Sequence, residues 1–193
     1  MKKDTLLKIS GFCGLILPIV TIISILISLL AVPGFSWTEN AISDLGRPGE
    51  AFCFFNLSII LIGFFLMIFT LSFFKIFKEN KVTNSIIFLS SFFFIGIGVF
   101  PLPNPNHIYI SSLFFIAFPI GLLLLGIKLV KIKNSFLKKM GYFALVNSML
   151  AVFSGFLLLI LEGVAIPEVL VVMSGFLWCM VFGLKILFGL DTL

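Results

Sequence analysis

The stretch that decides the fold is residues 9–32, ISGFCGLILPIVTIISILISLLAV, which contains no charged side chain. A helix of about 20 residues crosses a hydrocarbon core of about 30 Å, so this stretch is long enough to span a membrane. Similar runs recur along the chain, in which 61% of residues are hydrophobic and only 11% are charged. A soluble domain cannot cover its surface with so little charge. The sequence therefore predicts a polytopic membrane protein.

Apolar length predicts six spans, which would form a single integral-membrane domain over residues 1–193. The predicted spans are residues 9–32, 51–74, 82–100, 108–130, 140–161 and 169–187. A helix satisfies its backbone hydrogen bonds internally, as lipid requires, and these continuous runs do not alternate as barrel strands do. We therefore expect an all-α fold, a bundle of six transmembrane helices. The spacing of Ala151 and Gly155 further predicts close helix packing.

The lysines predict the orientation of this bundle. Thirteen residues are lysine or arginine, and because Arg47 is the one arginine, twelve are lysines. All of them precede the first span, join spans two and three or spans four and five, or end the sixth span. The positive-inside rule places this side, and with it both termini, in the cytoplasm. We therefore expect a multi-pass protein of the cell membrane with cytoplasmic N- and C-termini.

The connection after the first span, residues 37–50, reads WTENAISDLGRPGE and would then face outward. It carries Asn40 and Ser43 together with Asp44 and Arg47. Asp44 and Arg47 are three residues apart, close enough to pair within a short helix. One interpretation is therefore a capped turn held by a local ion pair. The other is a functional site in which Asp44 faces His107 across a cavity.

The other two outward connections bring further ionisable residues to the same face. His107 follows the proline-rich segment FPLPNPN at 100–106. Glu162 and Glu168 lie in the last connection, on either side of residues 163–167. A histidine beside carboxylates can act as a general acid or base. We therefore assign candidate catalytic roles to Asp44, His107 and Glu162, and candidate substrate-binding roles to Asn40, Ser43, Arg47 and Glu168, with Arg47 as an anion clamp.

The sequence predicts neither a cofactor nor a metal ion. It contains no glycine-rich phosphate loop, no dinucleotide fingerprint and no C-x-x-C pair, and its single histidine excludes haem held by two histidines. His107 and two carboxylates could supply three zinc ligands, but known zinc motifs place two histidines at a fixed spacing. The net charge of +5 reflects topogenic lysines that also meet lipid headgroups, so no nucleic-acid partner is expected.

Two motifs in the outward connections resemble a known family. Asn40 precedes the segment SDLG at 43–46, and the segment GVFP at 98–101 is followed by His107. In combination these elements are similar to the integral-membrane family catalogued as domain of unknown function 998. The resemblance implies a six-helix membrane protein over nearly the whole chain, and it supports the site's location but no activity. The family often carries a glutamate–arginine pair near the last outer hairpin, whereas this chain has Glu162 and Glu168 without an arginine.

Two classes of function fit this pattern. The first is a protein that binds or acts on a lipid or lipid-linked substrate at the outer leaflet, with membrane lipids as partners. The alternative is a non-enzymatic small transporter or an assembly subunit, for which a second copy of the chain or another membrane protein would be the partner. Few polar residues lie within the spans, chiefly Asn56 and Asn147, which argues against a polar path through the bundle. Whether the protein is an enzyme stays open.

Overall fold

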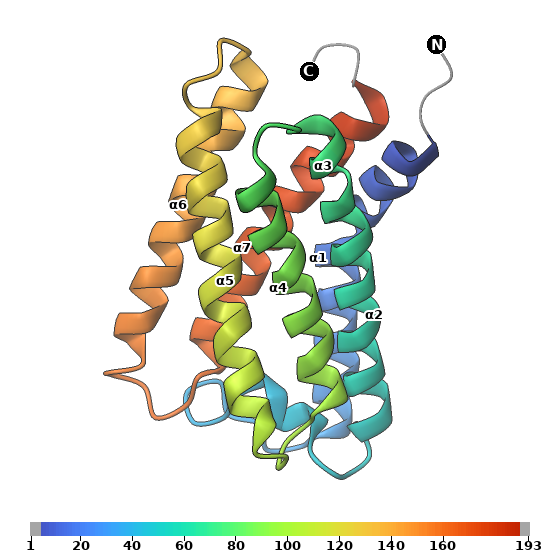
Figure 1. Ribbon diagram of the computed structural model, residues 1–193. Helices are drawn as coiled ribbons and strands as arrows, with labels where there is room; N and C mark the ends of the chain where they lie inside the picture. The colour runs from blue at the N-terminus through green and yellow to red at the C-terminus, as the bar shows by residue number, and fades with distance from the viewer. Residues whose placement is uncertain (1–4, 190–193) are drawn as a thin grey trace.

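The computed structural model describes residues 5–189, which form helices and their connections. Two short helices, the 3₁₀ helix η1 (Ile42–Gly46) and α3 (Phe73–Ile76), accompany the long ones (Figure 1). Each long helix contacts its neighbours in a closed ring that runs α1–α2–α4–α5–α6–α7 and returns to α1. The long helices are α1 (Thr5–Ala31), α2 (Phe52–Leu71), α4 (Lys81–Val99), α5 (Asn106–Leu129), α6 (Ser135–Leu157) and α7 (Ala165–Phe188).

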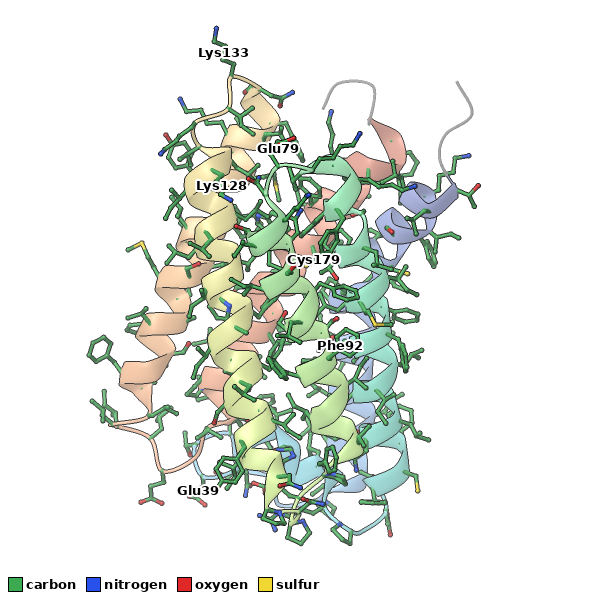
Figure 2. The ribbon with its side chains drawn as sticks, in the orientation of Figure 1. Glu39, Glu79, Phe92, Lys128, Lys133 and Cys179 are labelled. Atoms are coloured by element: carbon green, nitrogen blue, oxygen red, sulfur yellow. The ribbon has the colours of Figure 1, made fainter. Side chains whose placement is uncertain are left out.

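The structure confirms the prediction of an all-helical chain with six membrane-spanning candidates. Each long helix, with α3 extending α2 to Ile76, is long and apolar enough to cross a membrane. Large hydrophobic side chains cover the outside of the bundle, among them Phe12, Leu57 and Phe92, the last labelled in Figure 2. An exterior of this kind suits a lipid solvent and would be costly in water. The chain is therefore built as a multi-pass membrane protein.

The fifth span differs from its prediction at both ends. Residues 140–161 were expected, whereas α6 runs from Ser135 to Leu157. It begins early because the Asn134 side chain accepts a hydrogen bond from the Leu137 N–H (3.1 Å) and so caps the helix. At the other end the helix stops short of Glu162, which lies exposed in the connection 158–164 and does not close the helix. Capping by Asn134, and not apolar length, therefore sets the start of this helix.

The two ends of the bundle differ in charge. The described lysines gather at one end, which we call the lysine end, and Lys2 and Lys3 lie outside the described residues. Figure 2 shows Lys133 and Glu79 there, and Glu39 at the opposite end. That opposite end, which we call the loop end, carries η1 and the connections 32–51, 100–105 and 158–164 (Figure 1). All predicted site residues therefore lie at the loop end.

Aromatic side chains fill the half of the bundle nearer the lysine end. Trp178 stacks on Phe182 with ring centroids 5.2 Å apart, and Phe73 packs edge-on against both rings. Trp178 also donates its indole N–H to the carbonyl oxygen of Met140 (2.8 Å), which links α7 to α6. All three rings are fully buried. Stacked and edge-on rings of this kind make a rigid, well-packed floor beneath the loop end.

Candidate ligand-binding site

The connection after α1 folds into a compact turn around η1. One oxygen of the Asp44 carboxylate accepts the Ala41 backbone N–H (2.8 Å), and the other accepts the Arg47 Nε–H (2.6 Å). Arg47 is 52% exposed and Asp44 21%, so the pair lies at the surface. Both carboxylate oxygens are thus engaged within their own loop. The local ion pair expected for this segment is present, and Asp44 makes no hydrogen bond with His107.

The segment SDLG is anchored to the bundle at its last residue. Asn56 on α2 donates its side-chain N–H to the carbonyl oxygens of Gly46 (2.9 Å) and Phe52 (2.7 Å). A Cβ atom on Gly46 would lie only 2.5 Å from the Asn56 side-chain oxygen, so this approach requires glycine. Leu45, one residue earlier, is fully buried and packs into the core. These contacts fix the position of Ser43 and Asp44 over the bundle.

Backbone hydrogen bonds clasp this connection to the one before α7. The Gly163 N–H donates to the Thr38 carbonyl (2.7 Å), and the N–H groups of Val164 and Ala165 donate to the Asn40 carbonyl (3.0 and 2.9 Å). Asn40 thus satisfies an N–H at the start of α7 that the helix itself leaves free. Its side-chain oxygen accepts the Ser36 N–H (2.8 Å). Asn40 therefore holds the loop end together.

Glu168 ties α7 to η1 from the first turn of α7. Its carboxylate accepts the Ile42 backbone N–H (2.7 Å) with one oxygen. Within residues 5–189 no lysine, arginine or histidine lies within ion-pair distance of this carboxylate, since Arg47 is paired with Asp44. A carboxylate at the end of a membrane-spanning helix without a cationic partner is costly, which makes Glu168 a candidate for a functional role. No hydrogen bond to its second oxygen is found among the described residues.

His107 is oriented by the connection that precedes it. Its Nδ1 lies 2.8 Å from the Phe100 carbonyl oxygen, and because a carbonyl only accepts, Nδ1 carries the proton and donates. The ring is 4% exposed, and in the neutral ring Nε2 is left as an acceptor. Gly98, in the same GVFP segment, lets α4 approach the Asn56 backbone of α2, where a Cβ atom would lie 2.6 Å from the carbonyl oxygen.

Almost all predicted site residues line one cavity of about 690 Å³ at the loop end, which we call the groove. Asn40 is the exception, because it serves the clasp described above. Side chains of α5, α6 and α7 form the rest of the wall. Polar and charged lining residues come from the connections and the helix ends: Glu39, Ser43, Asp44, Arg47, His107, Glu162 and Glu168. The helices contribute mainly apolar ones, including Ile108, Phe115, Ile116, Ala151, Leu158 and Val171.

A narrower cavity of about 50 Å³ continues from the groove into the bundle, and we call it the inner cavity. It lies among α1, α2, α4, α5 and α7, and its walls are mostly apolar side chains, chiefly isoleucine and phenylalanine. Both cavities are lined by Ser43, His107 and Glu168, which we call the collar, and by Ser111 and Phe115. Deeper inside, Ser24 is 2% exposed, and its hydroxyl has no hydrogen-bond partner.

Sequence reasoning missed several lining residues. Ser24 and Ser154 look like ordinary small residues in apolar runs, and only the structure shows that both hydroxyls are buried, unpartnered and beside a cavity. The Ala151–Gly155 spacing suggested helix packing, yet a Cβ atom on Gly155 would meet no atom within 4 Å. Both residues line the groove instead. Nothing in the local sequence separates a packing glycine from one that borders open space.

Comparisons with known proteins support the family and no activity. A family model described as Protein of unknown function (DUF998) matches residues 15–185, a range that includes part of each long helix. This match confirms the resemblance carried by the SDLG and GVFP…His motifs. No curated protein and no solved structure matches the chain. Among residues 5–189, no group of three or more histidine, cysteine or acidic side chains is placed to hold a metal ion.

Proposed function

Because this chain belongs to the family described as Protein of unknown function (DUF998), we propose its function from the geometry of the groove. The protein binds a lipid or lipid-linked molecule from the outer leaflet of the cell membrane. The observation that carries this proposal is that one cavity joins the charged residues of the connections to the apolar sides of α5, α6 and α7. An amphiphile needs both surfaces in one site.

The size and walls of the groove suit such a ligand. At about 690 Å³ the groove falls in the usual range for small-molecule sites, about 300–1,000 Å³. Phe115, Ile116 and Leu158 offer an apolar surface for a chain. Gly155 leaves space beside them that a larger residue would fill. The head of the ligand would then lie at the collar and Arg47, and its chain along the helices.

The proposed roles of the candidate residues follow from their contacts. His107 meets the head group through Nε2 and is the group best placed to move a proton, so it is the catalytic residue if the protein is an enzyme. Asp44 positions Arg47 and the loop, since both of its oxygens are engaged there. Glu162 lies exposed at the rim of the groove. Ser43 and Glu168 contact the ligand at the collar.

The outer-leaflet placement rests on the lysines. The described lysines lie at the end opposite the groove, and the positive-inside rule assigns that end to the cytoplasm. The α1 N-terminus and the α7 C-terminus lie at the same lysine end (Figure 1). The groove would therefore open to the outer leaflet, with both termini cytoplasmic.

The aromatic floor favours a binding site over the alternative of a small transporter. The inner cavity is lined by residues of the loop-end half, such as Thr21 and Ile62, whereas Trp178 and Phe182 pack the half beyond it. A polar solute that left the inner cavity toward the lysine end would meet these stacked rings. A closed-ended cavity is what a bound lipid head needs. An assembly subunit would still use the same surface, with a partner protein in place of lipid.

Lipid retention tests the proposal. The protein would be extracted in native nanodiscs, and its tightly bound lipid would be measured by mass spectrometry after delipidating washes. A Cβ atom at Gly155 would meet no atom within 4 Å, so Gly155→Trp introduces a large side chain where the groove has open space. Val152→Trp is the matched control, since Val152 lies on the same helix, is exposed and does not line the groove. We expect Gly155→Trp to lose most bound lipid and Val152→Trp to keep it. Equal retention in both variants would overturn the proposal.

A further inference from the structure

Three groups that can accept a hydrogen bond line the collar, and none of them receives one from the described residues there; the Ser43 hydroxyl can also donate. They are the second oxygen of Glu168, the hydroxyl of Ser43 and Nε2 of His107, whose Nδ1 is committed to Phe100. The three side chains make no hydrogen bond or ion pair with one another within the described residues, although all line both cavities. They therefore line the same two cavities without satisfying each other. A group with several N–H donors placed between them would satisfy all three.

We infer that the collar binds the primary ammonium group of the ligand. A primary ammonium carries three N–H donors and one positive charge, as the lysine side chain does. It would give one hydrogen bond to each collar acceptor and neutralise the Glu168 carboxylate. A phosphate or carboxylate has no donor to offer these groups and would be repelled by Glu168. The chemistry of the collar therefore selects a cation that donates hydrogen bonds.

The charge of the whole groove points the same way. Its lining includes the carboxylates of Glu39, Asp44, Glu162 and Glu168 against the single guanidinium of Arg47, a net formal charge of −3 with His107 neutral. Arg47 is itself paired with Asp44. A field of this sign, focused by apolar walls, attracts cations and opposes anionic head groups. A role for Arg47 as an anion clamp, which the sequence suggested, does not by itself account for the negative charge of the groove.

The inner cavity offers little polar surface of its own. Ser24 is one of its lining residues, but its hydroxyl is buried and has no hydrogen-bond partner among the described residues. Most of the other lining side chains are apolar. The collar and the charge of the groove, and not the inner cavity, therefore favour an ammonium group.

A primary ammonium fits the collar better than a quaternary one. Quaternary ammonium groups have no N–H donors and are held by cages of aromatic rings. Phe115 is the one phenylalanine, tyrosine or tryptophan that lines both cavities, so the collar offers no cage. This inference rests on the proposed lipid site, and it names the class of lipid: a phospholipid whose head group ends in a primary amine. Its phosphate would lie toward Arg47, whose Nε alone is engaged by Asp44.

The test compares head groups in reconstituted nanodiscs. Wild-type protein would be placed in phosphatidylcholine discs that contain either phosphatidylethanolamine or phosphatidylglycerol, and bound lipid would be measured by native mass spectrometry. We expect phosphatidylethanolamine to be enriched on the protein over both other lipids. Loss of one charge-assisted hydrogen bond is worth about tenfold in affinity or more. Glu168→Gln should therefore reduce the enrichment about tenfold while total bound lipid stays the same.

Matched variants keep the test interpretable. Glutamine can still accept the Ile42 N–H, and Ser43→Ala removes a hydroxyl for which residues 5–189 show no hydrogen-bond partner, so both variants should fold. Glu50→Gln, an exposed carboxylate at the loop end that does not line the groove, is the control and should leave the enrichment unchanged. Bound lipid without head-group preference would overturn the ammonium site alone. Failure of Gly155→Trp to release lipid would instead overturn the lipid site.

A soluble analogue separates the two possible sources of the amine. Glycerophosphoethanolamine carries the same head group without chains. If the ligand is a lipid, the analogue should compete poorly, because it lacks the apolar part that contacts α5 and α6. If it displaced phosphatidylethanolamine at equal concentration, the ammonium site would stand and the lipid as its source would be overturned.

Discussion

His107 donates its Nδ1–H to the Phe100 carbonyl oxygen across 2.8 Å, which joins the first turn of α5 to the end of α4. This bond fixes the ring's tautomer and leaves Nε2 as an acceptor in the neutral ring. The acceptor is the backbone carbonyl at the end of the GVFP helix, and the histidine that follows supplies the donor. His107 thus has a structural side and a ligand side, which substitutions can separate.

The first prediction separates these two sides. His107→Asn keeps an N–H donor near the position of Nδ1 and removes the acceptor at Nε2, so we expect wild-type stability and weakened lipid retention. His107→Ala removes both and should lower the free energy of unfolding by about 1–3 kcal/mol, because the buried Phe100 carbonyl loses its partner. Thermal unfolding in detergent and lipid mass spectrometry measure the two effects. Equal lipid retention in wild type and His107→Asn would contradict a ligand role for Nε2.

The second prediction concerns the clasp between the first and last loop-end connections. A Cβ atom on Gly163 would overlap the backbone of Glu39 and Asn40, which cannot move as a flexible side chain can. We expect Gly163→Ala to destabilise the protein by about 1–3 kcal/mol and to increase proteolysis of residues 32–51. Gly155→Ala is the control, because its site is open. If Gly163→Ala lowered the free energy of unfolding no more than Gly155→Ala does, the close backbone contact at the clasp would be contradicted.

The third prediction ranks the two partners of the ion pair. Arg47→Gln removes a surface pair, which is typically worth about 0–1 kcal/mol. Asp44→Ala also removes the acceptor of the Ala41 N–H and should cost about 1 kcal/mol more, as the loss of a helix cap does. Unfolding should also be measured in low and high salt. High salt should screen the contribution of the Asp44–Arg47 ion pair and leave that of the Ala41 hydrogen bond unchanged. The opposite ranking would mean that Asp44 does not organise the loop.

The fourth prediction tests the orientation of the bundle. In a Cys53→Ser background, which removes the exposed native cysteine, Glu50→Cys and Lys133→Cys place single reporters at the loop end and the lysine end. We expect a membrane-impermeant maleimide to label Glu50→Cys in intact cells, and Lys133→Cys only after the membrane is opened. Labelling of both variants in intact cells would contradict the predicted topology.

Much of the fold could be predicted because lipid imposes simple rules on a helix. Apolar length located all six long helices, and the three-residue spacing of Asp44 and Arg47 made their ion pair one of two interpretations of the segment. The start of α6 was misplaced because a cap at Asn134 begins the helix before the apolar run. The length of an apolar run identifies the part of a helix that crosses the hydrocarbon core. A cap sets the end of the helix at the membrane interface, where hydropathy changes slowly along the sequence.

The candidate site was predicted in location and only partly in geometry. The charged residues of the loop end indicated where the groove lies, because ionisable side chains near a bilayer are costly and are usually functional. The roles of Asn40 and Asp44 differ from a direct ligand contact because backbone N–H groups, which carry no sequence signal, take up their oxygens. Ser24 and Gly155 could not be predicted as cavity-lining residues, because the sequence does not show which small residues border a cavity.

Photocrosslinking would show most directly whether the acyl chain of a lipid lies in the groove. A phospholipid with a diazirine on its acyl chain would be incorporated into membranes that contain the protein, irradiated, and mapped by peptide mass spectrometry. We predict adducts concentrated on the groove-lining positions of α5 and of the α6 end, and their loss in Gly155→Trp but not in Val152→Trp. These positions are Ile108, Ser111, Ser112, Phe115, Ile116, Ala151, Ser154, Gly155 and Leu158. Adducts spread equally over exposed positions outside the groove, such as Leu57 and Leu61 on α2, would contradict a lipid site there.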